Sequence, residues 1–238
     1  MCPDATDLPD TQYALQLVGA DRLRLNRAKS VDRPGPHQML LRVEAVGLCF
    51  SDLKLLKQFA DHPRKGPIVR GIDPAVLAEI PSYVPGDAPT VPGHETVCRI
   101  VAVGDQVRHH RLGERVTVQA DYRPFRTAGS NAAFGYNFEG ALQEYFIADE
   151  RIVVEPDTQQ RYLIGVPDDL SASAVALVEP WACVENSYVT AERRTVKAGG
   201  QLLVAAEAQA DIAGLAECFS PDGPPGGVTA LCARPDQV

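Results

Sequence analysis

Glycine and proline break the chain into short apolar runs, and this spacing limits the possible folds more than any other feature of the sequence. There are 19 glycines and 19 prolines among 238 residues, and most lie between runs in which apolar and polar residues alternate. Alternation with a period of two is typical of strands that bury one face, and glycine and proline between such runs favour turns. The first two thirds of the chain are therefore predicted to form a mainly β barrel or sandwich.

Seven strands are expected in this part of the chain, with turn residues between most of them. They are predicted at residues 13–18, 22–26, 39–46, 96–103, 114–119, 141–148 and 151–154. Ser51 follows the third strand and is predicted to cap a short helix over residues 51–56. Residues 59–90 have no sustained periodicity and are predicted to be a long loop.

A different pattern begins near residue 168. An alanine- and valine-rich run predicts a helix over residues 168–189, with a kink at Pro180 because proline cannot continue a helix undisturbed. A strand at 201–205, a helix at 210–219 and a strand at 227–233 follow, an order that predicts the start of a parallel α/β unit. We therefore expect two domains, residues 1–190 and residues 191–238.

Composition excludes several classes of protein. The chain has 23 basic and 31 acidic residues, and its net charge of −8 disfavours nucleic acid and anionic membrane surfaces as partners. There is no apolar stretch near the ~18 residues of a membrane helix and no signal-like start, so a cytoplasmic location is expected. The six cysteines are scattered without a C-x-x-C pair, which argues against a disulfide scaffold or a four-cysteine zinc knot.

Cys49 and His94 are the residues most suggestive of chemistry. Cys49 follows a predicted strand, and His94 lies 45 residues later in a Pro-Gly turn. Thiolate and imidazole are both zinc ligands. Taken singly, each residue has a simpler interpretation, Cys49 as a small buried apolar residue and His94 as a hydrogen-bonded loop histidine.

Six segments, in order along the chain, resemble the zinc-dependent medium-chain dehydrogenase/reductase family. They are residues 43–53 (VEAVGLCFSDL), 91–95 (VPGHE), 100–104, 112–116, 140–145 and 176–180 (ALVEP). The resemblance implies a mainly β, GroES-like barrel as the catalytic domain, followed here by an incomplete α/β, Rossmann-like segment. Within the family the chain looks most similar to the sorbitol and sorbose-1-phosphate reductase branch, because Glu179 replaces a cysteine and the sequence ADHPRK follows the first helix.

The resemblance also implies a site with one catalytic zinc. Cys49, His94 and Glu179 would be the protein ligands, with a fourth position left for water or the substrate oxygen. Glu95 is a further candidate ligand and catalytic residue, although neighbours in an extended segment point apart, so it would reach the zinc through water or after rearrangement. Asp52 would accept a hydrogen bond from His94, or serve simply as an acidic residue at a helix N-terminus. Ser51 would relay the substrate proton.

A nicotinamide cofactor, NAD or NADP, is implied in the same way, but its binding site looks incomplete. The family places a glycine fingerprint after a strand such as 201–205, whereas this chain reads AEAQAD over residues 206–211. Glu207 and Asp211 would put negative charge near a pyrophosphate that prefers backbone N–H groups. No cofactor-binding residue is assigned, and the chain alone is expected to bind dinucleotides very weakly. A second zinc is not expected, because residues 99–182 contain no cysteine.

The predicted function is that of a zinc-dependent oxidoreductase for a small-molecule alcohol, polyol or sugar phosphate. His62, Arg64, Lys65 and Arg70 form a basic group in the 59–90 segment that would hold a substrate phosphate, or would simply be solvated. A homodimer, or contact with further C-terminal sequence, is expected to cover the α/β segment. Two alternatives remain: a metal-binding catalytic-domain fragment or remnant without dehydrogenase activity, and a metal-free interaction module.

Overall fold

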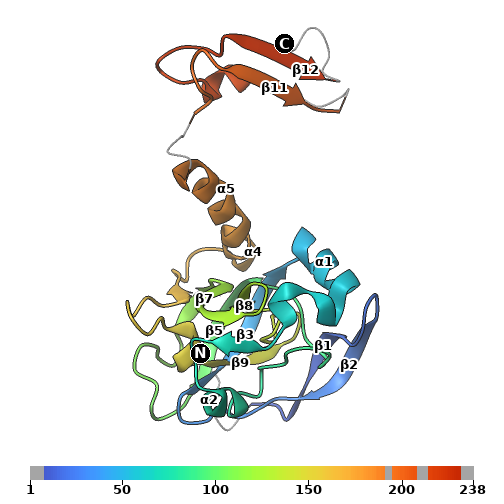
Figure 1. The fold of residues 1–238 in the computed structure, drawn as a ribbon. Coiled ribbons are helices and arrows are strands. Elements are labelled where there is room, and N and C mark those ends of the chain that lie inside the picture. Colours follow the sequence, from blue (N-terminus) through green and yellow to red (C-terminus); the bar gives the residue numbers. More distant parts are fainter. Residues whose placement is uncertain (1–7, 191–194, 208–213, 232–238) are drawn as a thin grey trace. The chain divides into compact units, whose positions relative to one another are not determined.

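A computed structural model describes residues 8–190, 195–207 and 214–231. The chain divides into two compact units, Met1–Pro180 and Trp181–Val238. Figure 1 shows that the first unit is built mainly from strands, as the sequence predicts. The division at Pro180 lies ten residues before the predicted domain boundary at residue 190, and that boundary stays a prediction.

The first unit contains ten strands and several short helices among the described residues. The strands are β1 (Thr11–Leu17), β2 (Leu23–Ser30), β3 (Gln38–Gly47), β4 (Ile68–Arg70), β5 (Glu95–Val103), β6 (Arg115–Val118), β7 (Asp121–Thr127), β8 (Asn131–Ala133), β9 (Tyr145–Asp149) and β10 (Leu163–Gly165). The helices are α1 (Phe50–Gln58), α2 (Pro74–Ala78), α3 (Glu150–Val153), α4 (Ala172–Ala176) and the start of α5 (Val178–Thr190), with 3-10 helices η2 (Phe59–Asp61) and η3 (Pro63–Lys65).

A five-stranded antiparallel sheet in the order β10-β6-β5-β3-β9 forms the centre of this unit. Two smaller sheets, β1-β2 and β4-β7-β8, complete it. Strand β3 is paired with β5 so that Gly47 lies opposite Glu95. The end of β3 therefore meets the start of β5, and residues 45 positions apart in the sequence become neighbours.

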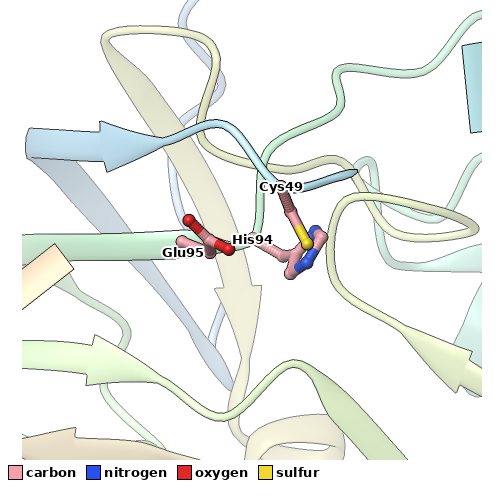
Figure 2. A group of neighbouring side chains, drawn as sticks. All are labelled: Cys49, His94 and Glu95. Carbon is pink, nitrogen blue, oxygen red and sulfur yellow. The ribbon is translucent and has the colours of Figure 1, made fainter. Parts of the chain in front are cut away.

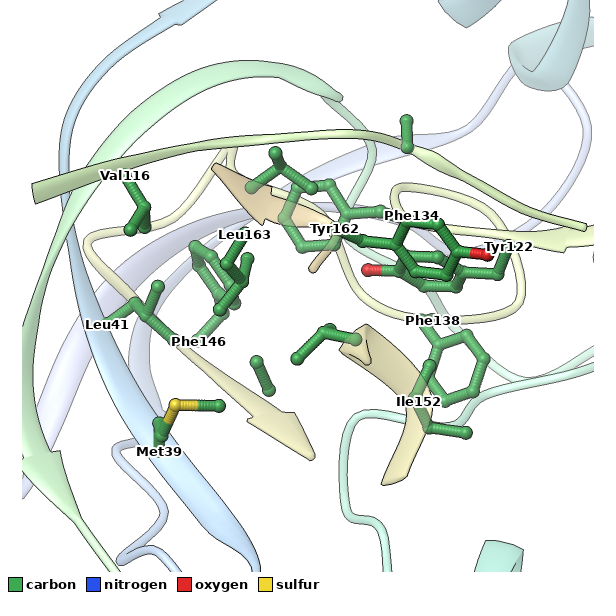
Figure 3. Packing of buried hydrophobic residues seen from close by; sticks show 14 of the residues in the cluster. Met39, Leu41, Val116, Tyr122, Phe134, Phe138, Phe146, Ile152, Tyr162 and Leu163 are labelled. Carbon is green, nitrogen blue, oxygen red and sulfur yellow. The ribbon is translucent and has the colours of Figure 1, made fainter. Parts of the chain in front are cut away.

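The core lies on both faces of the central sheet around β3, so the predicted alternation of buried and exposed residues does not hold there. Met39 and Leu41 on β3 are fully buried and share one face, where they pack with Phe146 of β9 and Leu163 of β10 (Figure 3). Burying side chains of this size stabilises a fold by roughly 1.5–3 kcal/mol each. Leu40, between Met39 and Leu41, is also buried and packs with Val101 and Ile147 in a second cluster, so this part of the central sheet is covered on both faces.

Near residue 150 one strand prediction is wrong and another is confirmed only in its second half. Residues 151–154 were expected to be a strand, but Glu150–Val153 is the short helix α3, because the Asp149 side chain accepts the Arg151 N–H at 3.0 Å and caps it. The predicted strand 141–148 is reduced to β9, since the backbone N–H groups of residues 140–142 donate to carbonyl oxygens of residues 91–93 instead.

The prediction of an irregular loop over residues 59–90 is also wrong, because this segment contains η2, η3, β4 and α2. A buried lysine organises it. Lys65 is 0% exposed, and its ammonium donates to the carbonyl oxygens of Val84 and Ala88, the latter at 2.9 Å. A side chain that satisfies distant backbone carbonyls gives the segment an internal order that no periodicity reveals.

Stability should depend on the protonation of Lys65. Burial lowers the pKa of Lys65 to about 8, while Asp87 and Glu139 oppose the shift. Between this value and the ordinary lysine pKa the unfolded chain holds the proton and the folded chain does not, so stability rises with pH. Between pH 7 and pH 10, we expect the free energy of unfolding of the natural chain to rise by about 2 kcal/mol more than that of Lys65→Met. Urea unfolding followed by circular dichroism measures this difference. A Lys57→Met control should keep the rise, and an equal rise in Lys65→Met would refute the assignment to Lys65.

The predicted helix over residues 168–189 is two helices, not one with a kink. Helix α4 begins after Ser171, whose hydroxyl accepts the Ala174 N–H at 3.3 Å, and ends at Ala176. Helix α5 starts at Val178, so Pro180 lies in its first turn. In a continuous helix the Pro180 ring would clash with the carbonyl of residue 176, whereas the first turn of a new helix accommodates it. The helix is therefore interrupted at Leu177.

The second unit contains β11 (Gln201–Ala205) and β12 (Gly227–Leu231), which pair in parallel as predicted. The predicted helix 210–219 lies partly outside the described residues, and its described part is a 3-10 helix, η4 (Leu215–Cys218). Asp211 and residues 232–233 also lie outside them. None of the helices in the described part of the chain has the length and hydropathy that a membrane crossing requires.

Candidate metal centre

The ends of β3 and β5 bring together three of the four predicted metal ligands. Cys49 follows the end of β3 by two residues, His94 directly precedes β5, and Glu95 is its first residue (Figure 2). The Cys49 sulfur, a ring nitrogen of His94 and a carboxylate oxygen of Glu95 lie within 4.8 Å of one another. His94 and Glu95 are each only 5% exposed. The group is compact enough to hold one metal ion.

The start of α1 differs from the prediction that Ser51 caps it. Cys49 occupies the N-cap position, and the Asp52 side chain accepts the Cys49 backbone N–H at 3.0 Å. The other carboxylate oxygen of Asp52 lies 3.5 Å from His94 Nδ1 and accepts the Gly93 N–H at 3.3 Å. Asp52 thus ties the helix start to both segments that carry candidate ligands. An acceptor at Nδ1 favours a proton there and leaves Nε2 as the donor atom for a metal.

Ser51 lies between the two candidate ligands. Its hydroxyl is 3.1 Å from Cys49 Sγ and 3.3 Å from His94 Nε2. Because Ser51 is in the first turn of α1 and not at its cap, its hydroxyl is directed to the side-chain cluster. Both predicted catalytic residues on this helix, Ser51 and Asp52, therefore contact the cluster.

The charges around the cluster suit a divalent cation. Burial raises the pKa of the Cys49 thiol, hydrogen bonds from Ser51 lower it by less, and the Glu95 carboxylate raises it further. Burial alone would lower the pKa of His94, but the hydrogen bond and charge of Asp52, together with Glu179 and Glu95, raise it. A bound cation compensates such carboxylates and deprotonates a coordinating thiol. Sulfur, nitrogen and oxygen donors together are a typical zinc set.

The two candidate acidic ligands are placed differently. Glu95 fits beside Gly47, where a Cβ would fall on the Glu95 carboxylate and lie 3.1 Å from its Cβ, so the glycine leaves room for this side chain. Glu179, in the first turn of α5, is near enough for its charge to raise the pKa of His94. Among the described residues the compact group nevertheless contains Glu95 and not Glu179.

Comparison with known proteins gives the family of the chain. Residues 35–158, more than half of the sequence, match the alcohol dehydrogenase GroES-like domain. The chain belongs to this family. Its resemblance to medium-chain alcohol and polyol dehydrogenases is thereby confirmed, as is the mainly β GroES-like fold followed by an incomplete α/β segment.

Three similar proteins illustrate the family. D-altritol 5-dehydrogenase of Agrobacterium fabrum is 29% identical over 75% of this chain and 46% of its own length. The zinc-type alcohol dehydrogenase-like protein YphC of Escherichia coli is 27% identical over 62% of this chain and 41% of its own length. The crystal structure of 2R,3R-butanediol dehydrogenase from Bacillus subtilis has a TM-score of 0.56, with 23% identity over 82% of this chain and 51% of that chain. The chain thus spans about half the length of the relatives it matches.

Tyr136 is a residue of this alcohol dehydrogenase GroES-like domain that the sequence analysis missed. Its ring centroid lies 5.8 Å from that of His94 and 4.9 Å from that of His62. Burial raises the pKa of its hydroxyl, while a hydrogen bond with Ser51 lowers it. Tyr136 therefore forms a wall beside the cluster. The only local signal is an aromatic residue directly after Gly135, whose φ is +80°.

The four predicted phosphate-binding residues are not equivalent. Lys65 is buried and already bonded to backbone carbonyls, so it is removed from this group. Arg64 lies over the Tyr136 ring, with 5.8 Å from Cζ to the centroid, and pairs with Asp121 at 3.4 Å. His62 contacts the same ring at an interplanar angle of 37°, and Arg70 is exposed on β4. Of the four residues, only Arg64 and His62 contact Tyr136, the ring that also lies beside His94.

Proposed function

We propose that this chain supplies the zinc-binding catalytic half of an NAD- or NADP-dependent dehydrogenase for small-molecule alcohols or polyols. The observation that carries the proposal is the compact group of Cys49, His94 and Glu95 with the Ser51 hydroxyl between its sulfur and nitrogen donors. The names of relatives, a polyol dehydrogenase and a zinc-type alcohol dehydrogenase-like protein, support it. They also favour an enzyme over a metal-free interaction module.

Each residue of the cluster would have a separate role in the reaction. Cys49 and His94 would hold the metal, with Glu95 or Glu179 as the third protein ligand. Zinc bound there would polarise an alcohol or carbonyl oxygen. Asp52 would keep the proton of His94 on Nδ1, and the Ser51 hydroxyl would relay the proton of the substrate hydroxyl, accepting it while passing its own proton on towards solvent. General acid–base groups must lie within about 3 Å of the atoms they serve, and Ser51 already lies at this distance from the candidate ligands.

A nicotinamide cofactor is proposed only because the family to which the chain belongs uses one. Glycines after the first strand of a dinucleotide-binding unit let backbone N–H groups approach the pyrophosphate. The turn after β11 carries Ala206 and Glu207 in their place. No residue of this chain is proposed as a nicotinamide ligand.

Binding of a polyol tests the proposed function without requiring turnover. Xylitol titrated into the zinc-loaded chain should shift amide NMR signals of residues near Ser51 with a dissociation constant of about 1 mM, roughly −4 kcal/mol. The chain stripped with a chelator should show no such shifts, because the metal supplies the contact to the hydroxyl. Ser51→Ala should weaken binding several-fold, and Ser130→Ala, on the exposed turn between β7 and β8, should not. Equal binding with and without zinc would contradict the proposal.

A phosphorylated polyol is the finer form of the proposed substrate. Arg64 is near the cluster through Tyr136, and a charge-assisted hydrogen bond contributes about 1.5–3 kcal/mol, a factor of 10 or more. We expect sorbitol 6-phosphate to bind the zinc-loaded chain about 10-fold more tightly than sorbitol, and Arg64→Ala to remove the difference. Arg123→Ala is the matched control, since Arg123 pairs with the same Asp121 at 3.2 Å. Calorimetry that finds no preference for the phosphate would refute this substrate class.

The proposal also covers the cellular location and the oligomeric state of the chain. A reducing, cytoplasmic compartment is supported by the free thiols of Cys49, Cys98 and Cys218. Leu203 on β11 and Leu231 on β12 are exposed, and a second copy or further C-terminal sequence would cover them. Sedimentation equilibrium should therefore show self-association at micromolar concentration, and a purely monomeric chain would contradict the homodimer.

A further inference from the structure

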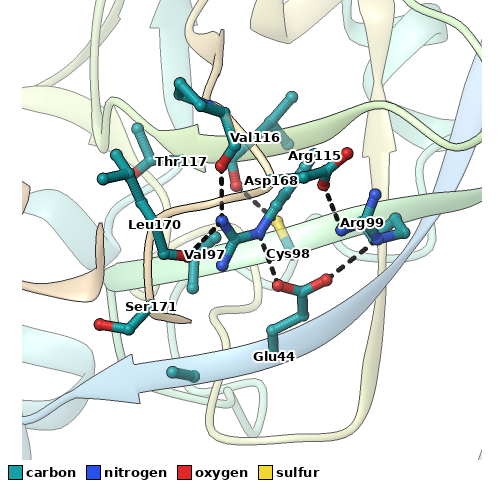
Figure 4. A network of polar contacts seen from close by, with 12 residues as sticks. Glu44, Val97, Cys98, Arg99, Arg115, Val116, Thr117, Asp168, Leu170 and Ser171 are labelled. Atoms are coloured by element: carbon teal, nitrogen blue, oxygen red, sulfur yellow. Dashed lines mark hydrogen bonds and ion pairs between the residues drawn. The ribbon is translucent and has the colours of Figure 1, made fainter. Parts of the chain in front are cut away.

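A polar network joins the neighbouring strands β3, β5 and β6 and contacts the segment that leads to Glu179. The Glu44 carboxylate on β3 accepts from Arg99 Nε of β5 at 3.0 Å and from Arg115 Nε of β6 at 2.7 Å (Figure 4). Arg115 is only 6% exposed. Replacing a buried ion pair by apolar residues is often neutral or stabilising, so stability alone is weak reason for such a network.

Both arginines also hold the stretch of chain between β10 and α4. Arg115 Nη1 donates to the carbonyl oxygens of Pro167 at 2.7 Å and Leu170 at 2.8 Å. Arg99 Nη2 binds the Asp168 carboxylate at 2.7 Å. A planar guanidinium fixes its partners in a defined geometry, so these contacts hold residues 167–170 against the sheet.

Residues 167–170 are followed directly by the helices that lead to Glu179. Ser171 caps α4, which packs against β3 and β5, the strands whose ends carry Cys49 and His94. After the interruption at Leu177, Glu179 lies in the first turn of α5, three residues beyond the end of α4. A short helix that packs on the sheet transmits the placement of its N-terminus to the residues that follow it.

We infer that Arg115, together with Glu44, Arg99 and Asp168, is a positioning network that sets where Glu179 lies relative to Cys49 and His94. This inference rests on the proposed zinc centre and adds to it a means of placing its most distant candidate ligand. The network ties residues 167–170, which precede the helices leading to Glu179, to β3, β5 and β6, and β3 and β5 lead to the other candidate ligands. Arg115 is its central positioning residue.

Zinc affinity in a double-mutant cycle tests this. The zinc dissociation constant is measured by competition with a chromogenic chelator for the natural chain, Arg115→Gln, Glu179→Gln and the double variant. Loss of outer contacts to a metal site typically weakens affinity 10- to 100-fold. We expect Arg115→Gln to weaken zinc binding about 10-fold in the natural background and less than 2-fold in the Glu179→Gln background. Arg161→Gln is the control, because it breaks an ion pair with Glu114 without touching residues 167–170.

Asp168→Asn covers the case in which Arg115→Gln does not fold, because the Asp168 side chain is 76% exposed. It should weaken zinc binding about 3-fold, and only when Glu179 is present. An equal loss with and without Glu179, or no loss in either background, overturns the positioning role. If the natural chain binds zinc through Cys49 and His94 while the cycle is additive, the inference fails and the proposed function survives. A natural chain that binds no zinc contradicts the proposed function itself.

Discussion

Replacing Cys49 or His94 by alanine should reduce the zinc content of the purified chain from about one equivalent to nearly none. Each residue supplies one of the two strongest donors in a group whose ligand atoms lie within 4.8 Å of one another. A structural or catalytic zinc site has only three or four protein ligands, so the loss of a thiolate or an imidazole leaves too few. Elemental analysis of protein purified without chelator and dialysed against metal-free buffer measures the content directly.

Matched controls separate loss of the site from general damage. Cys218→Ala and His109→Ala remove an exposed cysteine and an exposed histidine outside the compact group and should keep one zinc. Unchanged zinc in Cys49→Ala would place the metal elsewhere. A content near two equivalents would require a second site, which the absence of cysteine from residues 99–182 argues against.

Gly140→Ala should destabilise the first unit by about 3 kcal/mol, the upper end of the range for overpacked positions. A Cβ at Gly140 would lie 2.7 Å from both Gly135 Cα and Pro92 O and would fall on Gly93 O. All three are backbone atoms, so no side chain can turn away. The Gly140 N–H also donates to Val91 O at 2.6 Å. The turn before His94 must therefore move, and zinc binding should weaken with stability.

Gly165→Ala provides the comparison for this prediction. A Cβ at Gly165, on β10, would make only an ordinary contact of 3.5 Å with Glu114 Oε1. Urea unfolding should therefore show less than about 1 kcal/mol of change for Gly165→Ala, as is usual for substitutions outside packed or strained positions. Equal effects of the two alanines would show that the close packing of residues 92, 93 and 135 around Gly140 is not rigid.

The central sheet could be predicted because its strands carry their own pattern. β3 and β5 are ten and nine residues long and rich in apolar residues, so each can be predicted as a strand without its partner. Strands without this pattern were missed. β7 contains Pro124 and three charged residues in seven, and β4, β8 and β10 have three residues each. Such strands form because a neighbouring strand is in place, which the local sequence does not record.

The candidate site was predicted in part for the same reason. Cys49 and His94 lie next to the ends of paired strands, within sequence segments that resemble the dehydrogenase family, and this resemblance located them. Glu95 was expected to point away from His94 because neighbours in a strand alternate. However, β5 begins only at Glu95, and Gly93, with a φ of +92°, bends the chain immediately before His94. The rule of alternation does not hold across that turn. Tyr136 comes from a distant loop, and only the folded chain brings it to the cluster.

The absorption spectrum of the chain with cobalt(II) in place of zinc tests the central claim most directly. Cobalt reports both ligand type and geometry, because tetrahedral sites with sulfur and nitrogen donors differ from octahedral oxygen sites. We predict a thiolate-to-cobalt charge-transfer band that disappears in Cys49→Ala, and intense visible absorption that changes when xylitol is added. Weak visible absorption without a thiolate band, unaffected by xylitol, would contradict a zinc centre built on Cys49 and His94.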